Sequence, residues 1–246
     1  MTAVVRHKTA QSSKGVAWLH ILWLAARPGL KVSHRDRCID RVKAMSATVT
    51  LWPDDPSPGS GFASDRALSA QVDSYTVARI QLLTSIRRLR DAAQLVVDDD
   101  GWGTHLLMLR PALVLAAKAA WIARPVLSEE RVRRTLGVLL NDQRKGAKAM
   151  RDAVSQGAIS EFEQVASRFE KSCNELANLV PLSPVAPPGD QTMIRELGAD
   201  VDRCYGTEDA SSDMQLLWNV SSSLAHGEKW FRCSLAGFSV SRSRVF

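Results

Sequence analysis

Two side chains near the end of a late predicted helix could take part in catalysis. His226 follows Ser222 by four residues, so both lie on one helix face and could form a Ser–His pair. Nucleophilic catalysis would also need an orienting carboxylate and an oxyanion site, and no motif marks either. The competing interpretation is structural: a His in the last turn interacts favourably with the helix dipole, and Gly227 is an ordinary C-terminal stop. The structural interpretation is preferred, with catalysis by His226 as the alternative.

A second candidate site is a row of cations on the helix predicted from Glu129 to about Val154. Four of them lie within about 60° of the helix circumference and span about 27 Å: Arg133, Arg144, Lys148 and Arg151, with Arg134 and Lys145 just beyond. This cationic ridge could bind a phosphate backbone or an acidic partner. The alternative is a solvated face with ordinary ion pairs, Glu129 with Arg133 and Glu130 with Arg134. The solvated face is preferred.

The net charge of +6 does not describe the chain evenly. Residues 1–44 contain nine Lys and Arg against two Asp, whereas residues 45–246 contain 23 basic and 24 acidic side chains. A domain committed to nucleic acid is usually basic, so the near-neutral remainder argues against one.

Motifs for metal, redox or phosphate chemistry do not occur in the sequence. The four cysteines are far apart, with no Cys-x-x-Cys pair, which favours reduced thiols in a cytoplasmic protein. Neither a Gly-rich phosphate loop nor a paired-carboxylate signature is found, so no metal and no cofactor is predicted.

The elements that must position these residues are organised around His105–Ala123, the most continuously apolar segment. Its longest uncharged run, seven residues from Pro111 to Ala117, is far shorter than the roughly 20 that a membrane span needs. Arg110, Lys118 and Arg124 fall within an arc of about 120°, which predicts one narrow solvent-facing stripe. The segment is therefore predicted to be a central, mostly buried helix.

Other helices are predicted from apolar residues spaced three and four apart. They run from Asp65 to Val97 with Ser64 as the N-cap, from Glu129 to Val154 capped by Ser128, from a capping box of Ser160 and Glu163 to Pro181, from Thr192 to Asp202, and from Asp213 to His226 with a capping box of Ser212 and Gln215. Cys173 falls in an apolar row, which predicts a buried, inert thiol.

The predicted fold is all-α, with a single helical-bundle-like domain of about five to six helices at 62–232. It is preceded by a basic N-terminal extension and a Pro/Ser/Gly-rich linker at 1–61, and followed by a tail at 233–246. The apolar run Val16–Ala26 could belong to a targeting segment, to a membrane-surface helix, or to an upstream extension that the domain does not need. The dispensable extension is preferred.

The order of these features resembles bacterial helical proteins of the HEPN-like kind. Two long helices, a capped basic helix and a late helix ending in Ser-x-x-x-His-Gly carry the resemblance, the last within LWNVSSSLAHGEKW. Ribonucleases of that superfamily place an Arg, four to six intervening residues and a His on one helix near a dimer interface. The resemblance therefore implies proton transfer by His226, with RNA held by the cationic ridge. Where the Arg would lie, this chain has Asn219, Val220 and Ser221.

The preferred functional hypothesis is a non-catalytic helical protein-interaction protein of bacterial type, forming a homo-oligomer or binding another protein. The alternative is a HEPN-like RNA-binding or RNA-cleaving protein that uses His226 and the cationic ridge. A third and least favoured hypothesis is a peripheral membrane-surface protein held by Val16–Ala26.

Overall fold

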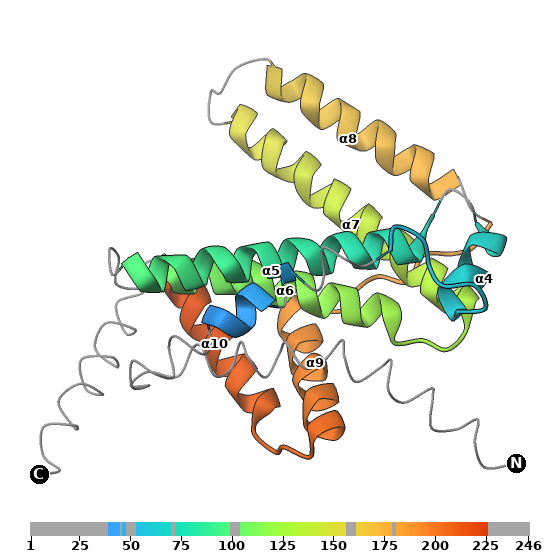
Figure 1. The fold of residues 1–246 in the computed structure, drawn as a ribbon. Helices are drawn as coiled ribbons and strands as arrows, with labels where there is room; N and C mark the ends of the chain where they lie inside the picture. The colour runs from blue at the N-terminus through green and yellow to red at the C-terminus, as the bar shows by residue number, and fades with distance from the viewer. Residues whose placement is uncertain are drawn as a thin grey trace, which may run out of the picture. The chain divides into compact units, whose positions relative to one another are not determined.

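The structure is a computed structural model that describes residues 39–44, 46–47, 53–69, 72–98, 104–155, 161–178 and 181–225. Within these ranges the regular elements are helices and no strand occurs, which confirms the all-α prediction (Figure 1). The helices are α4 (Gly61–Leu68), α5 (Ser74–Asp98), α6 (Thr104–Ala123), α7 (Ser128–Ser155), α8 (Glu161–Asn178), α9 (Asp190–Tyr205) and α10 (Ala210–Ala225). With further helical residues at 39–44 and 46–47, the predicted count of five to six is too low.

The chain divides into two compact units. Unit 1 holds the described residues of Met1–Trp52, Leu83–Ala117 and Asp190–Phe246, and unit 2 holds those of Pro53–Leu82 and Lys118–Gly189. Helices α5 and α6 each contribute to both units. The boundaries at 62 and 232 of one bundle domain stay predictions.

The helix predicted from Asp65 to Val97 is wrong as a single element, because α4 and α5 are separate. The Ser69 hydroxyl accepts a hydrogen bond from the Val72 N–H at 3.1 Å. The Asp73 carboxylate then accepts from the N–H and the hydroxyl of Thr76 at 3.1 and 2.9 Å, which caps α5. Side chains that bond the local backbone in this way compete with a continuous helix.

The start of α4 also differs from the prediction. Its N-cap is Ser60, whose hydroxyl accepts from the Ala63 N–H at 3.3 Å, and not Ser64. Leu68, the last residue of α4, is 52% exposed.

Part of the predicted linker is tied to α4 and α5 within unit 2. Arg66 of α4 pairs with Asp55 at 2.6 Å and with Asp73 at 2.7 Å. The Tyr75 hydroxyl of α5 donates to the carbonyl of Pro53 at 2.8 Å. Burial raises the pKa of Asp73, but hydrogen bonds from the capped backbone and from Arg66 outweigh burial and hold this pKa below its ordinary value.

The central helix is confirmed as α6, which begins at Thr104 and ends at Ala123. Its window His105–Ala123 is long and apolar enough to cross a membrane, yet half of that window is buried inside the structure, as in a core helix. The predicted solvent-facing stripe is wrong at Lys118, which is 7% exposed. The Lys118 ammonium pairs with Asp142 of α7 at 2.6 Å, and this partner permits its burial.

In unit 1, α9 and α10 lie side by side (Figure 1). Asp202 of α9 caps α10 by accepting from the N–H groups of Ala210 and Ser211 at 2.9 and 3.1 Å, and from the Thr207 hydroxyl at 2.7 Å. The capping box predicted at Ser212 is therefore wrong. Burial raises the pKa of Asp202, but these three hydrogen bonds outweigh it, so the pKa lies below its ordinary value.

The apolar face predicted for α9 is confirmed, since Ile194, Leu197 and Val201 are buried. Gly198 on the same helix is required by packing, because a Cβ there would collide with the backbone of Ser211 in α10.

Candidate functional site

Helices α7 and α8 lie side by side within unit 2 and form a hairpin (Figure 1). Val132, Leu136 and Leu140 of α7 form a buried cluster with Val72, which confirms the apolar face predicted for α7. Further along the hairpin, Gly146 of α7 faces the ring of Phe169 of α8: a Cβ at Gly146 would lie 3.1 Å from ring atoms.

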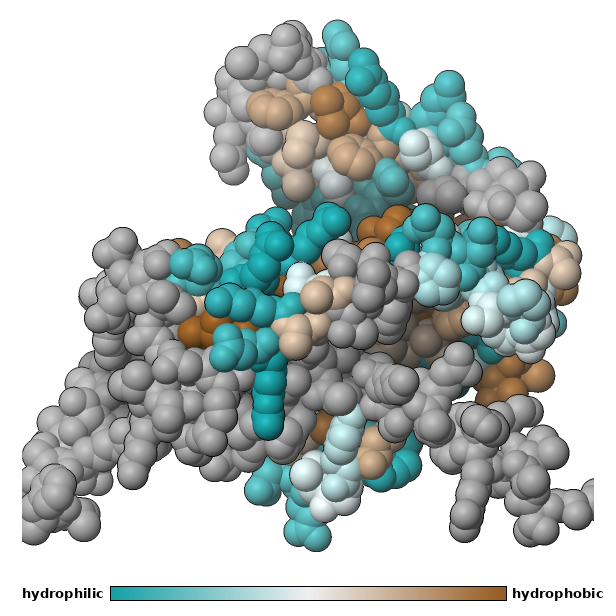
Figure 2. All heavy atoms as spheres, viewed as in Figure 1, coloured by the Kyte–Doolittle hydropathy of each residue, from teal (hydrophilic) through white to brown (hydrophobic). Residues whose placement is uncertain are grey.

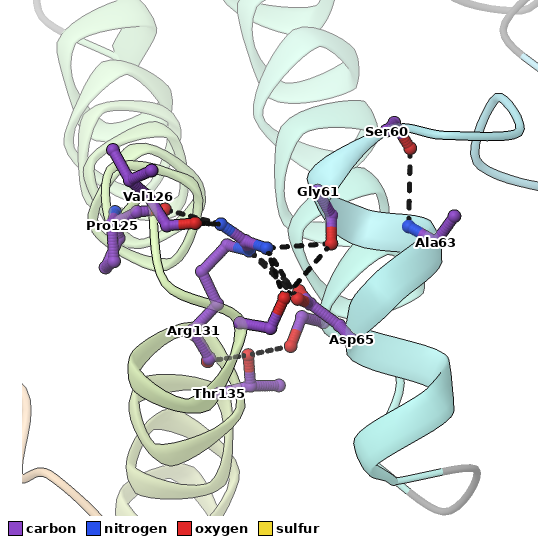
Figure 3. A network of polar contacts seen from close by, with 10 residues as sticks. Ser60, Gly61, Ala63, Asp65, Pro125, Val126, Arg131 and Thr135 are labelled. Carbon is purple, nitrogen blue, oxygen red and sulfur yellow. Dashed lines mark hydrogen bonds and ion pairs between the residues drawn. The ribbon is translucent and has the colours of Figure 1, made fainter.

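The first half of α7 carries a buried cation that sequence reasoning missed, Arg131. Its side chain is 5% exposed and that of its partner Asp65 is 0% exposed, with guanidinium–carboxylate distances of 2.6 to 3.1 Å (Figure 3). The same guanidinium donates to the carbonyls of Pro125, Val126 and Gly61 at 2.6 to 2.7 Å. A buried charge with this many partners fastens α4 and the α6–α7 connection to α7.

Arg133, a member of the predicted ridge, also has internal partners. Its Nε donates to the carbonyl of Ser183 at 2.9 Å, and its backbone carbonyl accepts from the Val185 N–H at 3.1 Å. Gly137 permits this packing, because a Cβ there would collide with the Val185 carbonyl. The segment around Ser183 and Val185 thus lies along the first half of α7.

The ion pairs predicted for the start of α7 are confirmed in one case and wrong in the other. Arg134 pairs with Glu130 at 2.9 Å as predicted, and also donates to the Trp121 carbonyl at 3.0 Å. Arg133 pairs at 3.5 Å with Glu130, three residues earlier, and not with Glu129.

The other three ridge residues lie together in the second half of α7. Arg144 and Lys148 are exposed, and within the described part of the chain neither forms an ion pair with a carboxylate. Arg151 is 64% exposed and pairs with Glu170 of α8. The structure therefore groups Arg144, Lys148 and Arg151, and leaves Arg133 in a different environment.

These three cations line an open concavity of about 410 Å³ between α7 and α8, called the hairpin concavity below. Its remaining lining is Ala147 from α7 with Glu170, Cys173 and Asn174 from α8. Cys173 is half-buried there and packs against the buried cluster of α7, so its predicted apolar environment is confirmed but its full burial is not. In Figure 2 the hairpin shows apolar atoms between hydrophilic ones on the face in view.

The two sides of the hairpin concavity differ in charge. On α7, residues 144–152 contain four Lys and Arg against one Asp. On α8, residues 161–178 contain four Glu against two Lys and Arg. Glu163 and Glu170 are seven residues apart, which places them two turns apart on nearly the same side of α8 as Asn174. Among the residues that line the concavity, three cations of α7 thus lie opposite one carboxylate of α8, Glu170, above a small floor of Ala147 and Cys173.

The candidate catalytic residue His226 lies outside the described residues, as does any contact that it makes with Ser222. The described part of α10 ends at Ala225. No group of three or more His, Cys, Asp or Glu in the described ranges is placed to hold a metal ion.

No protein-family model, curated protein or solved structure matches this chain. The HEPN-like resemblance and its implied ribonuclease chemistry stay predictions.

Proposed function

We propose that this protein is a non-catalytic protein-interaction protein that binds an acidic surface of its partner in the hairpin concavity. The observation that supports the proposal is the exposure of Arg144 and Lys148 beside a floor of Ala147 and Cys173. Cations that border an apolar floor attract a carboxylate-bearing partner and leave apolar area for it to cover.

The other cations of α7 support this assignment by contrast. Three guanidinium groups donate hydrogen bonds to carboxylates and carbonyls of the protein itself: those of Arg131, Arg133 and Arg134. Among the described residues, Arg151 of the concavity pairs with Glu170, and no ion pair is described for Arg144 or Lys148. At least two cations of one helix are therefore available to another molecule.

Binding of a labelled ten-residue polyglutamate, followed by fluorescence anisotropy, tests the proposal. We expect salt-sensitive binding that is about tenfold weaker in the double variant Arg144→Gln/Lys148→Gln, a loss of about 1.4 kcal/mol. The matched control is Arg168→Gln/Lys171→Gln, which removes the same charge from exposed positions of α8 that do not line the concavity.

The control variant should bind within about twofold of the wild type, because long-range charge alone is screened at ordinary ionic strength. Equal weakening of the two variants, or no binding of polyglutamate by the wild type, would contradict the proposal.

RNA binding is the second candidate, favoured by the same exposed Arg144 and Lys148. A uridine oligonucleotide should then bind with a logarithmic salt slope of about −0.7 for each phosphate contacted, so roughly −2 for three cations. Cleavage of that RNA by the wild type, lost in His226→Ala, would establish the alternative. The proposed function predicts intact RNA with both proteins.

A further inference from the structure

The hairpin concavity has the charge pattern of a self-complementary surface. Arg144, Lys148 and Arg151 line its α7 side and Glu170 lines its α8 side, and the exposed Glu163 lies two turns from Glu170 on nearly the same side of α8. Glu170 already meets Arg151 within one chain, which leaves Arg144, Lys148 and the exposed Glu163 without a described ion pair. A surface with opposite charges on its two sides can pair with a second copy of itself that is related by a 180° rotation, because each basic side then faces an acidic side.

A two-fold axis parallel to the hairpin brings these charges together. It places α7 of one copy against α8 of the other and keeps each residue at its own height along the hairpin. Because α7 and α8 run in opposite directions, Arg151 near the tip then faces Glu163 of the second copy. Lys148 and Arg144, further from the tip, face the region of Glu170.

The other two-fold arrangement is electrostatically excluded. An axis perpendicular to the hairpin would place α7 against α7, so that Arg144, Lys148 and Arg151 would face the same three cations of the second copy. Like charges placed opposite one another in an interface cost several kcal/mol. Charge therefore selects one of the two symmetric arrangements.

The floor of the concavity permits close approach. Ala147 and Cys173 are small side chains, and both line the concavity. A two-helix hairpin covers only part of an apolar stripe, whereas two hairpins packed together form a four-helix bundle with a shared core. The 18 residues of α8 give that bundle a length of about 27 Å.

We propose that the partner is a second copy of this chain, and that two hairpin concavities pack together about a two-fold axis parallel to α7 and α8. This inference rests on the proposed function, because it names the acidic surface that the concavity binds. That surface is α8 of the second copy.

Two charge-reversal variants of the full-length chain, measured alone and as a mixture, test the arrangement. One variant is Arg144→Glu/Lys148→Glu/Arg151→Glu, which makes both sides acidic, and the other is Glu163→Lys/Glu170→Lys, which makes both sides basic. Sedimentation velocity should show twice the 27.0 kDa chain mass for the wild type and the single-chain mass for each variant alone. An equimolar mixture of the variants should restore the doubled mass, because every facing pair is again opposite in charge.

Cross-linking through Cys173 gives a second measurement that does not depend on charge. With Cys38, Cys204 and Cys233 replaced by Ser, a short bis-maleimide should join two wild-type hairpins but not two copies of the acidic variant. Unchanged thermal melts of both charge variants will show that loss of the dimer is not loss of the fold.

The outcomes separate this inference from the proposed function. A wild type that stays monomeric at about 100 µM, or a variant mixture that stays monomeric, overturns the dimer. If that wild type still binds polyglutamate through Arg144 and Lys148, the concavity serves a different acidic protein. If it binds neither, both proposals fail.

Discussion

The two halves of α7 carry the same kinds of cation in different surroundings. In the first half, Arg131 is buried against Asp65, and Arg134 is held by Glu130 and the Trp121 carbonyl. In the second half, Arg144 and Lys148 are exposed along an open concavity. The segments of the same chain that surround a cation therefore decide whether it is structural or available for binding. The residue type and its place on a helix do not.

The largest expected effect comes from removing the buried carboxylate of the first half. Asp65→Ala should lower the free energy of unfolding by about 3–5 kcal/mol, because Arg131 would stay buried without its counter-charge. Urea unfolding measures the loss. The control is Asp55→Ala, whose side chain is 78% exposed and which should change stability by less than about 1 kcal/mol. Similar losses in the two variants would remove the distinction between a buried and an exposed pair.

A smaller effect is expected where the segment around Ser183 and Val185 lies along the first half of α7. Gly137→Ala should cost about 1–3 kcal/mol, because its Cβ would displace the Val185 carbonyl. Thermal unfolding of this variant should be compared with that of Gly189→Ala, because a Cβ added at Gly189 would meet no atom within 4 Å. A Gly137→Ala protein as stable as the Gly189→Ala control would mean that the segment packs elsewhere.

Arg134→Gln tests a cation of intermediate exposure. The guanidinium lies 5.0 Å from the centre of the Trp121 ring in addition to its bonds with Glu130 and the Trp121 carbonyl. We expect a loss of about 1 kcal/mol, the usual size of a partly exposed ion pair with a cation–π contact. Chemical denaturation should place it between Asp65→Ala and the second-half variants, and a loss as large as that of Asp65→Ala would contradict the order.

The smallest expected change in stability is in the second half. Arg144→Gln and Lys148→Gln should each alter the free energy of unfolding by less than about 0.5 kcal/mol, as surface substitutions usually do. The same two changes should nevertheless weaken polyglutamate binding and dimerisation. A destabilisation of about 2 kcal/mol or more in either variant would show that these side chains support the fold.

Much of the helix pattern could be predicted, because one buried face leaves a regular signal. The central helix, the face of α7 with Leu136 and Leu140, and the face of α9 with Ile194 and Val201 all follow apolar spacing. The break between α4 and α5 could not be predicted in this way. Ser69 and Asp73 fit the spacing of a continuous helix equally well, and only their bonds to the local backbone show that the helix stops.

The candidate site was predictable in part. Helical periodicity put Arg144, Lys148 and Arg151 on one side of α7, but it could not distinguish them from Arg133, whose partner Ser183 lies 50 residues away in sequence. The sequence pattern gave no signal for the role of Arg131, since its partner Asp65 lies 66 residues away in sequence. Pairs so distant in sequence form only when separate elements are brought together, and single-helix patterns carry no information about them.

Amide hydrogen exchange of the full-length protein at two concentrations tests the contrast between the halves of α7 most directly. Between about 1 and 100 µM, we expect slower exchange in residues 141–152 of α7 and 162–175 of α8, because dimerisation suppresses local opening there. Residues 128–137 should exchange at the same rate at both concentrations, since their partners lie within one chain. Equal exchange everywhere would contradict the proposed dimer, and slowing confined to residues 128–137 would contradict the assignment of the second half of α7 to binding.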